Sequence, residues 1–296
     1  MQAAGTIKTT ELCGRLGLKY HVVDSERTEN YVSPNELESL LKFSERWGFD
    51  VQTIVTVSAR HACSLERTTR LAEVMAKHEN ASLNLVAGNR AFLTEEEMTK
   101  PAAKRLAHLA RSARKILGDR TVFIGTEKLT KATLQISKEY DLIPFLLLDR
   151  ALEIKTAKIR EENGNGSIAL YVPYFATCGQ TSITTEIVRR FWQYAFRRRW
   201  VREAALERGY DLCLLESYLQ TELGSCSEPL DSDVAELLIG AIRKLSVCGE
   251  AEDFVRAFED FRRLDIDTII GLPANEEENQ VAAFSHYLHQ FRQRSD

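Results

Sequence analysis

The sequence predicts an α/β protein of the TIM-type (β/α)8 barrel class. Apolar runs rich in β-branched residues alternate along the chain with segments of helical spacing, which is the pattern of repeated βα units. These runs are nearly continuous rather than alternating with polar residues, as expected of parallel strands buried on both faces. About seven such runs occur in 296 residues, close to the strand number and usual length of this barrel. A doubly wound open sheet is the alternative fold.

In the first half of the chain, each of the first four predicted strands is followed by a predicted helix. Ser33 and Pro34 carry the cap and first-turn signals of a helix. Ser64 is the predicted cap of the next helix, and Gly118 suits the C-terminal end of the helix after it. The predicted strands here are 19–26, 51–57, 83–87, 121–125 and 143–148, and the predicted helices are 33–48, 64–78, 100–118 and 128–140.

The second half is less regular. Strands are predicted at 167–175 and 267–271, and a closing helix follows the latter. Between Thr181 and Leu264 the sequence carries no strand pattern and has helical character throughout. We therefore expect a helical insertion over about residues 181–264, ahead of the last strand. No Pro/Gly-rich linker divides the chain, which favours a single domain over residues 1–296.

The composition excludes several classes of protein. A net charge of −4 and a pI of about 6.0 do not suit a general nucleic-acid binder. No apolar run reaches membrane-spanning length, and the first residues lack the apolar core of a signal peptide. Six cysteines without CxxC spacing indicate reduced thiols rather than a disulfide framework. We expect a cytoplasmic protein with neither membrane nor nucleic-acid partner.

The ends of the predicted strands carry the candidate functional residues. In a parallel barrel, such residues gather at the rim where the strands end. A glycine at this point can simply let the chain turn, but the residues together predict a ligand site. Glu26 and His61 are the candidate catalytic residues among them. The predicted rim consists of Asp24, Ser25, Glu26, Ser58, Arg60, His61, Gly88, Asn89, Gly125, Thr126, Glu127, Asp149, Arg150, Tyr174 and Asn275.

Four segments resemble the luciferase-like superfamily of flavin- and deazaflavin-dependent oxidoreductases. The first, "TIVTVSARHACSLERTTRLAEVMAKHENASLNLVAGN", is closest to the alkanesulfonate monooxygenase branch. The others are "TVFIGTEKLTKATLQISKEYDLIPFLLL", "SIALYVPYFA" and "VCGEAEDFVRAFEDFRRLDIDTIIGLPA". Together they cover most of the chain from about residue 50 onward. The resemblance implies a barrel enzyme, a monooxygenase or reductase, that acts on a small organic substrate.

The resemblance also implies a cofactor, FMN or F420, across the C-terminal rim. Its ring system would lie near the ends of the second and third predicted strands. Its phosphate would lie where the strand at 121–125 leads into the next helix, because free N–H groups at a helix start attract anions. The cofactor-binding residues implied in this way are Ser58, Gly88, Asn89, Gly125, Thr126 and Lys128.

A third catalytic candidate, the partners and an alternative function follow from the same resemblance. Tyr171 falls where some monooxygenases have an active-site histidine. The family implies a homodimer, and a flavin reductase could supply reduced flavin. Residues 9–17 and 19–24 resemble the family's first helix and second strand, and the segment 1–8 lacks the apolar body of a first strand. The barrel thus lacks or replaces that strand, which leaves a non-catalytic homologue acting as a binding or partner subunit as the alternative function.

A metal site is not expected. His286 and His289 are three residues apart on the closing helix, a spacing that could bring both toward one ion. No carboxylate within a turn of them completes a ligand set. A solvated or packed pair is the favoured interpretation.

Overall fold

The computed structural model forms two compact units, which are described separately. Unit 1 comprises Met1–Leu147, Glu153–Leu170 and Leu264–Ile270, and unit 2 comprises Leu148–Leu152, Tyr171–Arg263 and Gly271–Asp296. The described residues are 2–25, 31–61, 63–88, 93–126, 129–164, 166–177, 188, 191–192, 195–196, 198–225, 232–273 and 278–295, with the backbone alone at 2–6, 24, 126, 220–225 and 295.

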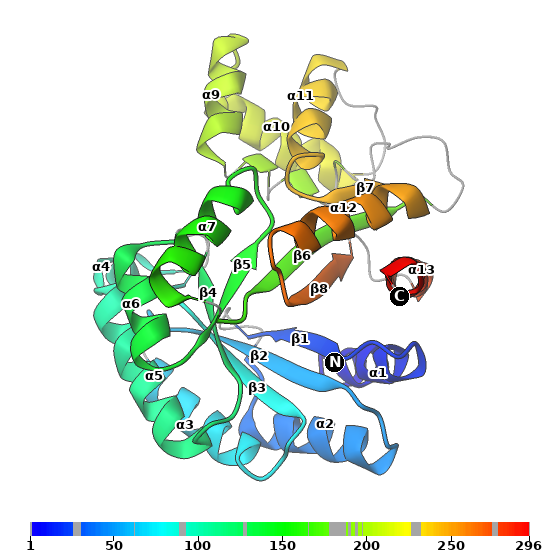
Figure 1. Cartoon of the computed structure of the whole chain (residues 1–296). Coiled ribbons are helices and arrows are strands. Elements are labelled where there is room, and N and C mark those ends of the chain that lie inside the picture. Colours follow the sequence, from blue (N-terminus) through cyan, green and yellow to red (C-terminus); the bar gives the residue numbers. More distant parts are fainter. Residues whose placement is uncertain are drawn as a thin grey trace. The chain divides into compact units, whose positions relative to one another are not determined.

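Unit 1 alternates strands with helices, as the sequence predicts (Figure 1). Its strands are β1 (Tyr20–Asp24), β2 (Gln52–Ser58), β3 (Ala81–Val86), β4 (Val122–Thr126) and β5 (Ile143–Leu147). Its helices are α1 (Gln2–Arg15), α2 (Pro34–Arg46), α3 (Ser64–Met75), α4 (Glu95–Thr99), α5 (Ala102–Leu117) and α6 (Lys131–Glu139), with most of α7 (Leu152–Asn163).

Unit 2 is mainly helical and has its own core. The strands β6 (Ala169–Ala176) and β8 (Thr268–Pro273) each begin in unit 1 and end in unit 2. A buried apolar cluster joins the end of β6 to the helices that follow it, and it includes Phe191, Trp192 and Ala195. The other elements of unit 2 are α9 (Arg199–Glu207), α10 (Leu212–Ser225), α11 (Ser232–Ile242), β7 (Val247–Gly249), α12 (Ala251–Arg263) and α13 (Glu278–Ser295).

The strand order identifies the fold. From β1 to β5, each strand pairs in parallel with the next one along the chain, and β6 pairs in parallel with β7. The hydrogen-bonded order is β1 to β7, with β8 next to β6. A doubly wound sheet would reverse direction partway through this order, so that alternative is wrong. The order belongs to a singly wound, TIM-type α/β fold.

The two faces of the strands in unit 1 differ in chemistry. Val55, Val57, Leu83 and Leu85 lie in one buried cluster with the apolar side chains of α2, α3 and α5. Because neighbouring residues of a strand point to opposite faces, the residues between them point away from these helices. We call the face opposite the helices the inner face. On the described strands β2 to β4 it carries Gln52, Ile54, Thr56, Ser58, Ser82, Asn84, Val86, Phe123 and Gly125.

Most element predictions are confirmed to within about two residues. Ser33 caps α2 in a full capping box with Glu36, and Gly118 ends α5 with a φ of 60°. A helix occupies Gln2–Arg15, so the described residues ahead of β1 form no strand. The helix α7 was not predicted.

Two predictions are wrong in detail. Ser64 does not cap α3, because the N-cap is Cys63 and the Ser64 hydroxyl instead donates to the carbonyl of Ala59 at 3.0 Å. The segment 181–264 is not wholly helical, since β7 lies within it. Three residues are too few to show a strand pattern in sequence. With β7 the structure describes eight strands rather than about seven.

No described helix is both long enough and apolar enough to cross a membrane. The single-domain organisation stays a prediction, which limited proteolysis would test.

Candidate functional site

The inner face of unit 1 is polar although it is buried. Ser58 and Ser82 are fully buried, and Thr56 and Asn84 are 7% and 4% exposed. Asn84 faces Thr56 in the register of β2 and β3, and its amide nitrogen donates to the Thr56 hydroxyl at 3.1 Å. A purely structural core would place apolar side chains here. The polar groups therefore mark this face as the candidate site.

One atom of this face has no partner among the described residues. The amide oxygen of Asn84 is buried and accepts no hydrogen bond. A buried, unpaired acceptor costs about 1–3 kcal/mol, and most such groups in proteins are satisfied. The sequence holds a signal for this residue, because Asn84 interrupts the apolar run Leu83 to Val86 at an inner-face position. The strand-end criterion missed it, since Asn84 lies within β3 rather than after it.

Two predicted cofactor-binding glycines lie against this polar group. A Cβ on Gly88 would be 2.4 Å from the Ser58 hydroxyl, and Gly88 also has a φ of +99°. A Cβ on Gly125 would be 2.5 Å from the Val86 side chain and 3.2 Å from the amide oxygen of Asn84. The ends of β2, β3 and β4 thus bring Ser58, Gly88 and Gly125 together, and their role in cofactor binding stays a prediction.

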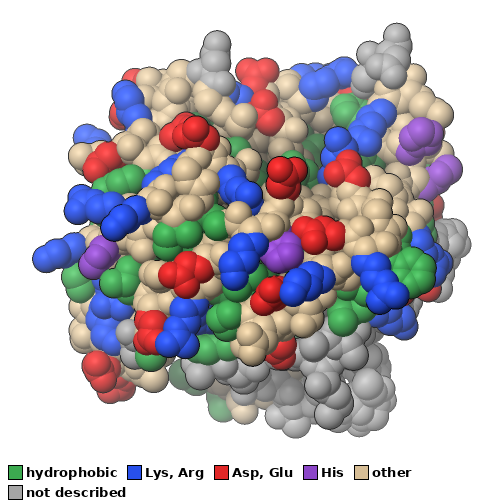
Figure 2. Space-filling view, turned by 90° about the horizontal axis from the view of Figure 1, so that it is seen from below, with side chains coloured by type: hydrophobic (Ala, Val, Ile, Leu, Met, Phe, Trp, Pro, Cys, Tyr) green, Lys and Arg blue, Asp and Glu red, His purple; other side chains and the backbone are tan. Residues whose placement is uncertain are grey.

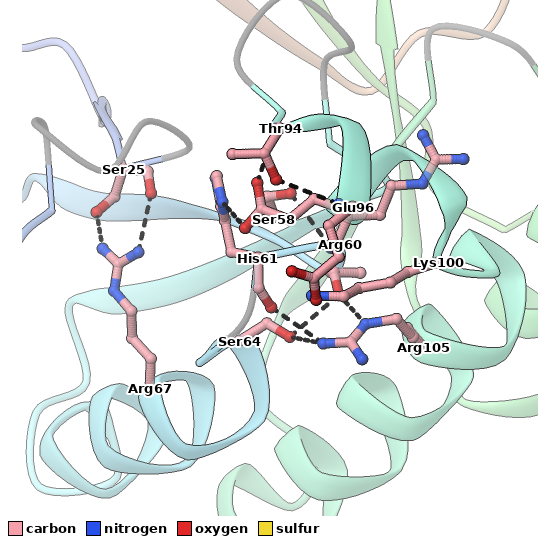
Figure 3. Close-up of polar contacts among 12 residues, drawn as sticks. Ser25, Ser58, Arg60, His61, Ser64, Arg67, Thr94, Glu96, Lys100 and Arg105 are labelled. Carbon is pink, nitrogen blue, oxygen red and sulfur yellow. Dashed lines mark hydrogen bonds and ion pairs between the residues drawn. The ribbon is translucent and has the colours of Figure 1, made fainter.

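Arg105 of α5 holds the loop that follows β2 (Figure 3). Its Nε donates to the carbonyl of Ala59 at 2.6 Å. A terminal nitrogen donates to the carbonyl of His61 at 3.0 Å and to the hydroxyl of Ser64 at 2.9 Å. The planar guanidinium suits several acceptors at once, and here it fixes the backbone from the end of β2 to the start of α3.

His61 is a buried residue paired with a carboxylate. Its side chain is 3% exposed, and its Nδ1 lies 3.1 Å from a carboxylate oxygen of Glu97. The other oxygen of Glu97 accepts from the backbone N–H of Thr94 at 3.1 Å, which completes the capping box of α4. The ring of Tyr31 meets the His61 ring edge-on at 5.6 Å. Sequence reasoning found His61 but not Glu97, which is 36 residues away.

Arg67 connects α3, the helix that follows the loop after β2, to the end of β1 (Figure 3). It donates to the carbonyl of Ser25 at 3.1 Å and to the Ser25 hydroxyl, and its guanidinium lies 3.3 Å from the centroid of the Tyr31 ring. Burial lowers the pKa of the Arg67 guanidinium, and the neighbouring Tyr31 opposes that shift. Contacts therefore run from the end of β1, through Tyr31 and His61, to α4.

The predicted phosphate anchor does not lie at the start of a helix. Gly125 and Thr126 belong to β4, and α6 begins only at Lys131. The hydroxyl of its cap, Thr130, accepts from the N–H of Thr133 at 3.1 Å, so one of the free N–H groups there is already bonded. The expectation of a helix starting at residue 128 is wrong, because Thr130 is the better capping residue.

Five of the remaining predicted residues, Glu26, Asn89, Glu127, Lys128 and Asn275, lie outside the described residues. Tyr171 is half-buried in β6 within unit 2, and its carbonyl accepts from the N–H of Leu148 at 3.0 Å.

Tyr174 is a core residue of unit 2. It is 2% exposed and stacks on Phe284 at 4.6 Å, and its hydroxyl donates to the carbonyl of Gln280 at 3.2 Å. These contacts account for Tyr174 without a ligand.

Among the described residues, no three His, Cys, Asp or Glu side chains gather as a metal site would require. The Nε2 atoms of His286 and His289 lie 2.8 and 3.0 Å from the side-chain amides of Gln290 and Gln293.

On the face drawn in Figure 2, basic and acidic side chains are interspersed.

Residues 8–280 match the model of a family described as a family of unknown function, DUF7388. No curated protein sequence matches the chain.

Solved structures share the fold over nearly the whole chain. An F420-dependent secondary alcohol dehydrogenase, in complex with an F420–acetone adduct, matches with a TM-score of 0.66 and 11% identity, over 99% of this chain and 96% of its own. MsnO8 without ligand matches with 0.62 and 12%, over 98% and 92%. The oxygenating constituent of 3,6-diketocamphane monooxygenase from Pseudomonas putida, in complex with FMN, matches with 0.55 and 12%, over 96% and 89%. At these identities the likeness shows the fold.

Proposed function

Since the chain belongs to the DUF7388 family of unknown function, we propose its activity from the fold and the inner face: a luciferase-like oxidoreductase, related to the alkanesulfonate monooxygenase branch. It would act as a monooxygenase or reductase on a small organic substrate, with reduced FMN or F420. One observation carries the proposal. The inner face of the parallel strands holds a buried amide oxygen, that of Asn84, which has no partner among the described residues.

The residues of this face fit such a cofactor. A flavin or deazaflavin ring presents an N–H between two carbonyl groups, and the amide of Asn84 offers both an acceptor and a donor. The hydroxyls of Thr56 and Ser58 lie on the same face. Gly88 and Gly125 let the Ser58 hydroxyl and the Val86 side chain approach the backbone closely, where a Cβ would collide. Two of the solved structures with this fold hold F420 or FMN, which supports the same class of ligand here.

The side chains would bind and orient the cofactor. Asn84 would accept from the ring N–H, while the Thr56 hydroxyl keeps the amide in place through its 3.1 Å bond. Ser58, held beside Gly88, would contact the ring from the end of β2. His61, oriented by Glu97, would be the proton-transfer group of the loop after β2. A bound reduced flavin or F420 would supply the electrons for the reaction, which amino-acid side chains cannot do.

The other expected site residues, the cellular location and the oligomeric state belong to the same proposal. Asn89, Thr126 and Lys128 remain proposed cofactor-binding residues, and Glu26 and Tyr171 remain proposed catalytic residues. The protein would be a cytoplasmic homodimer, with a flavin reductase as the source of reduced flavin if FMN is the cofactor.

Equilibrium titration tests the proposal. FMN and F420 are each titrated with the protein while their fluorescence is followed. We expect micromolar binding of at least one of them, and reoxidation of the reduced form in the presence of substrate. The Asn84→Leu variant should lose about tenfold or more in affinity, because it removes both polar groups at similar volume.

The matched control is Ser82→Ala. Ser82 lies on the same strand and the same face, two residues further from the strand end, and its hydroxyl accepts from Gln52 at 2.7 Å. This variant should bind as the wild type does. Absence of binding to both cofactors would overturn the proposal and leave the non-catalytic binding or partner subunit as the function.

A further inference from the structure

Arg60 is a half-buried cation without a described partner. It lies two residues after Ser58, in the loop at the end of β2, and its Nε is buried with no hydrogen bond. Its backbone N–H donates to the Ser58 hydroxyl at 3.4 Å. This bond positions the main chain of Arg60 without using its side chain. Figure 3 shows the Arg60 side chain directed away from the bonded group of Arg105 and Ser64.

The neighbouring acceptors serve other groups. Glu96 pairs with Lys100 at 3.5 Å. Glu97 uses one oxygen for His61 and the other for the N–H of Thr94. The carbonyls of Ala59 and His61 and the Ser64 hydroxyl accept from Arg105. Within the described part of the chain, these acceptors therefore do not use the N–H donors of the Arg60 side chain, and those donors can bind a ligand.

A guanidinium of this kind suits a phosphate. Its five N–H donors form a rigid fork that matches phosphate oxygens in pairs, and such charge-assisted bonds are stronger than neutral ones. A partly buried donor also loses less to competition from water than an exposed one. Arg60 stands at the end of the same strand that supplies Ser58 to the proposed cofactor site.

We propose that Arg60 binds the phosphate group of the cofactor. The assignment rests on the proposed function and names a phosphate-bearing flavin or deazaflavin as the ligand. It supplies a positive charge at the end of β2, whereas the helix start that was expected at residue 128 lies at Lys131. Arg60 acts by binding and takes no part in the chemical step.

Paired ligands test the assignment. FMN and riboflavin differ by one phosphate, and F420 and its tail-free deazaflavin differ by the phosphate-bearing tail. Wild type should bind the phosphate-bearing member of a pair more tightly. Arg60→Gln should lower that affinity about ten- to hundredfold, as expected for a charged hydrogen bond, and should leave the phosphate-free member unchanged. Arg60→Lys, which keeps the charge but loses the fork, should fall between the two.

Arg70→Gln is the matched control. Arg70 is an exposed residue of α3, paired with Glu66 at 2.7 Å, and its loss changes the net charge equally. This variant should keep the full preference for phosphate. The melting temperature of Arg60→Gln should stay close to that of wild type, because the Arg60 side chain has no hydrogen-bond partner among the described residues.

The outcomes separate the two proposals. A phosphate preference that persists in Arg60→Gln, or equal weakening of both members of a pair, overturns the Arg60 assignment and leaves the proposed function standing. Failure of wild type to bind any of the four compounds overturns the proposed function and the assignment with it.

Discussion

The carboxylate of Glu97 joins the imidazole of His61, 3.1 Å away, to the backbone N–H of Thr94, also at 3.1 Å. One side chain thus completes the cap of α4 and holds the loop after β2. Glu97→Ala should lower the free energy of unfolding by about 1–3 kcal/mol, because a cap and a buried hydrogen bond are lost together. Glu97→Gln should lose less, since glutamine can also close a capping box. Urea unfolding measures both.

The neighbouring Glu96 provides the control for this change. It is 86% exposed in its pair with Lys100, so Glu96→Ala should alter the same free energy by no more than about 0.5 kcal/mol. Equal losses in the Glu96 and Glu97 variants would show that the His61 contact adds nothing.

His21 should make stability depend on pH. Burial lowers its pKa from 6.5 to about 4, and its Nδ1 lies 2.9 Å from the Thr10 hydroxyl. The unfolded chain therefore takes up the proton first as pH falls. The free energy of unfolding should decrease between about pH 6.5 and pH 4, by about 3 kcal/mol in total.

Denaturant unfolding at several pH values, with His21→Gln beside wild type, measures the contribution of His21. The variant should show a shallower decrease over this window. His108→Gln, at an exposed position of α5, should follow wild type. A His21 variant with the wild-type slope would contradict the assignment.

Gly88→Ala should destabilise the protein for two reasons. The φ of +99° strains any residue with a Cβ, and that Cβ would be 2.4 Å from the Ser58 hydroxyl. We expect a loss of about 1–3 kcal/mol. Gly118→Ala provides a comparison, because its φ is +60° but nothing lies within 4 Å of the new Cβ, and it should lose less. In a Ser58→Ala background the Gly88→Ala loss should shrink, and thermal melts of the four variants would show whether it does.

Arg114 should be more important for stability than an ordinary surface arginine. It donates to the carbonyls of Tyr140 at 2.6 Å, Gly118 at 2.8 Å and Arg120 at 2.5 Å. Arg114→Lys should lower the free energy of unfolding by about 2–4 kcal/mol, because an ammonium cannot reproduce the fork. Arg111→Lys, whose side chain reaches the Tyr140 hydroxyl at 3.3 Å on the surface, should change it by less than about 0.5 kcal/mol. Similar losses in both variants would contradict the prediction.

Sequence patterns identified the fold because most helix-facing residues of the strands are apolar. Val55, Val57, Leu83 and Leu85 all join one cluster with the helices, and each run ends at a residue that a turn or cap requires. The strand β7 was not predicted because three residues are too few to show a strand pattern. Ser64 was predicted as a cap because it precedes a helical run, but its hydroxyl donates to the carbonyl of Ala59.

Part of the candidate site could be predicted from the sequence, and part could not. Ser58, Gly88 and Gly125 were found from the rule that parallel strands end together. Asn84 required knowing which face of β3 points away from the helices, and that depends on packing. The pairing of His61 with Glu97 joins residues 36 positions apart, and no local pattern reports a contact of that kind.

The strand order of unit 1 bears on how the chain folds as it is made. Every strand from β2 to β5 pairs with the strand synthesised just before it. Each pairing still joins residues 20 to 39 positions apart, and non-local contacts of this kind form slowly, but elongation at roughly 5–20 residues per second leaves time for each βα step. A ribosome-bound chain can therefore extend this sheet one strand at a time, from β1 toward β5.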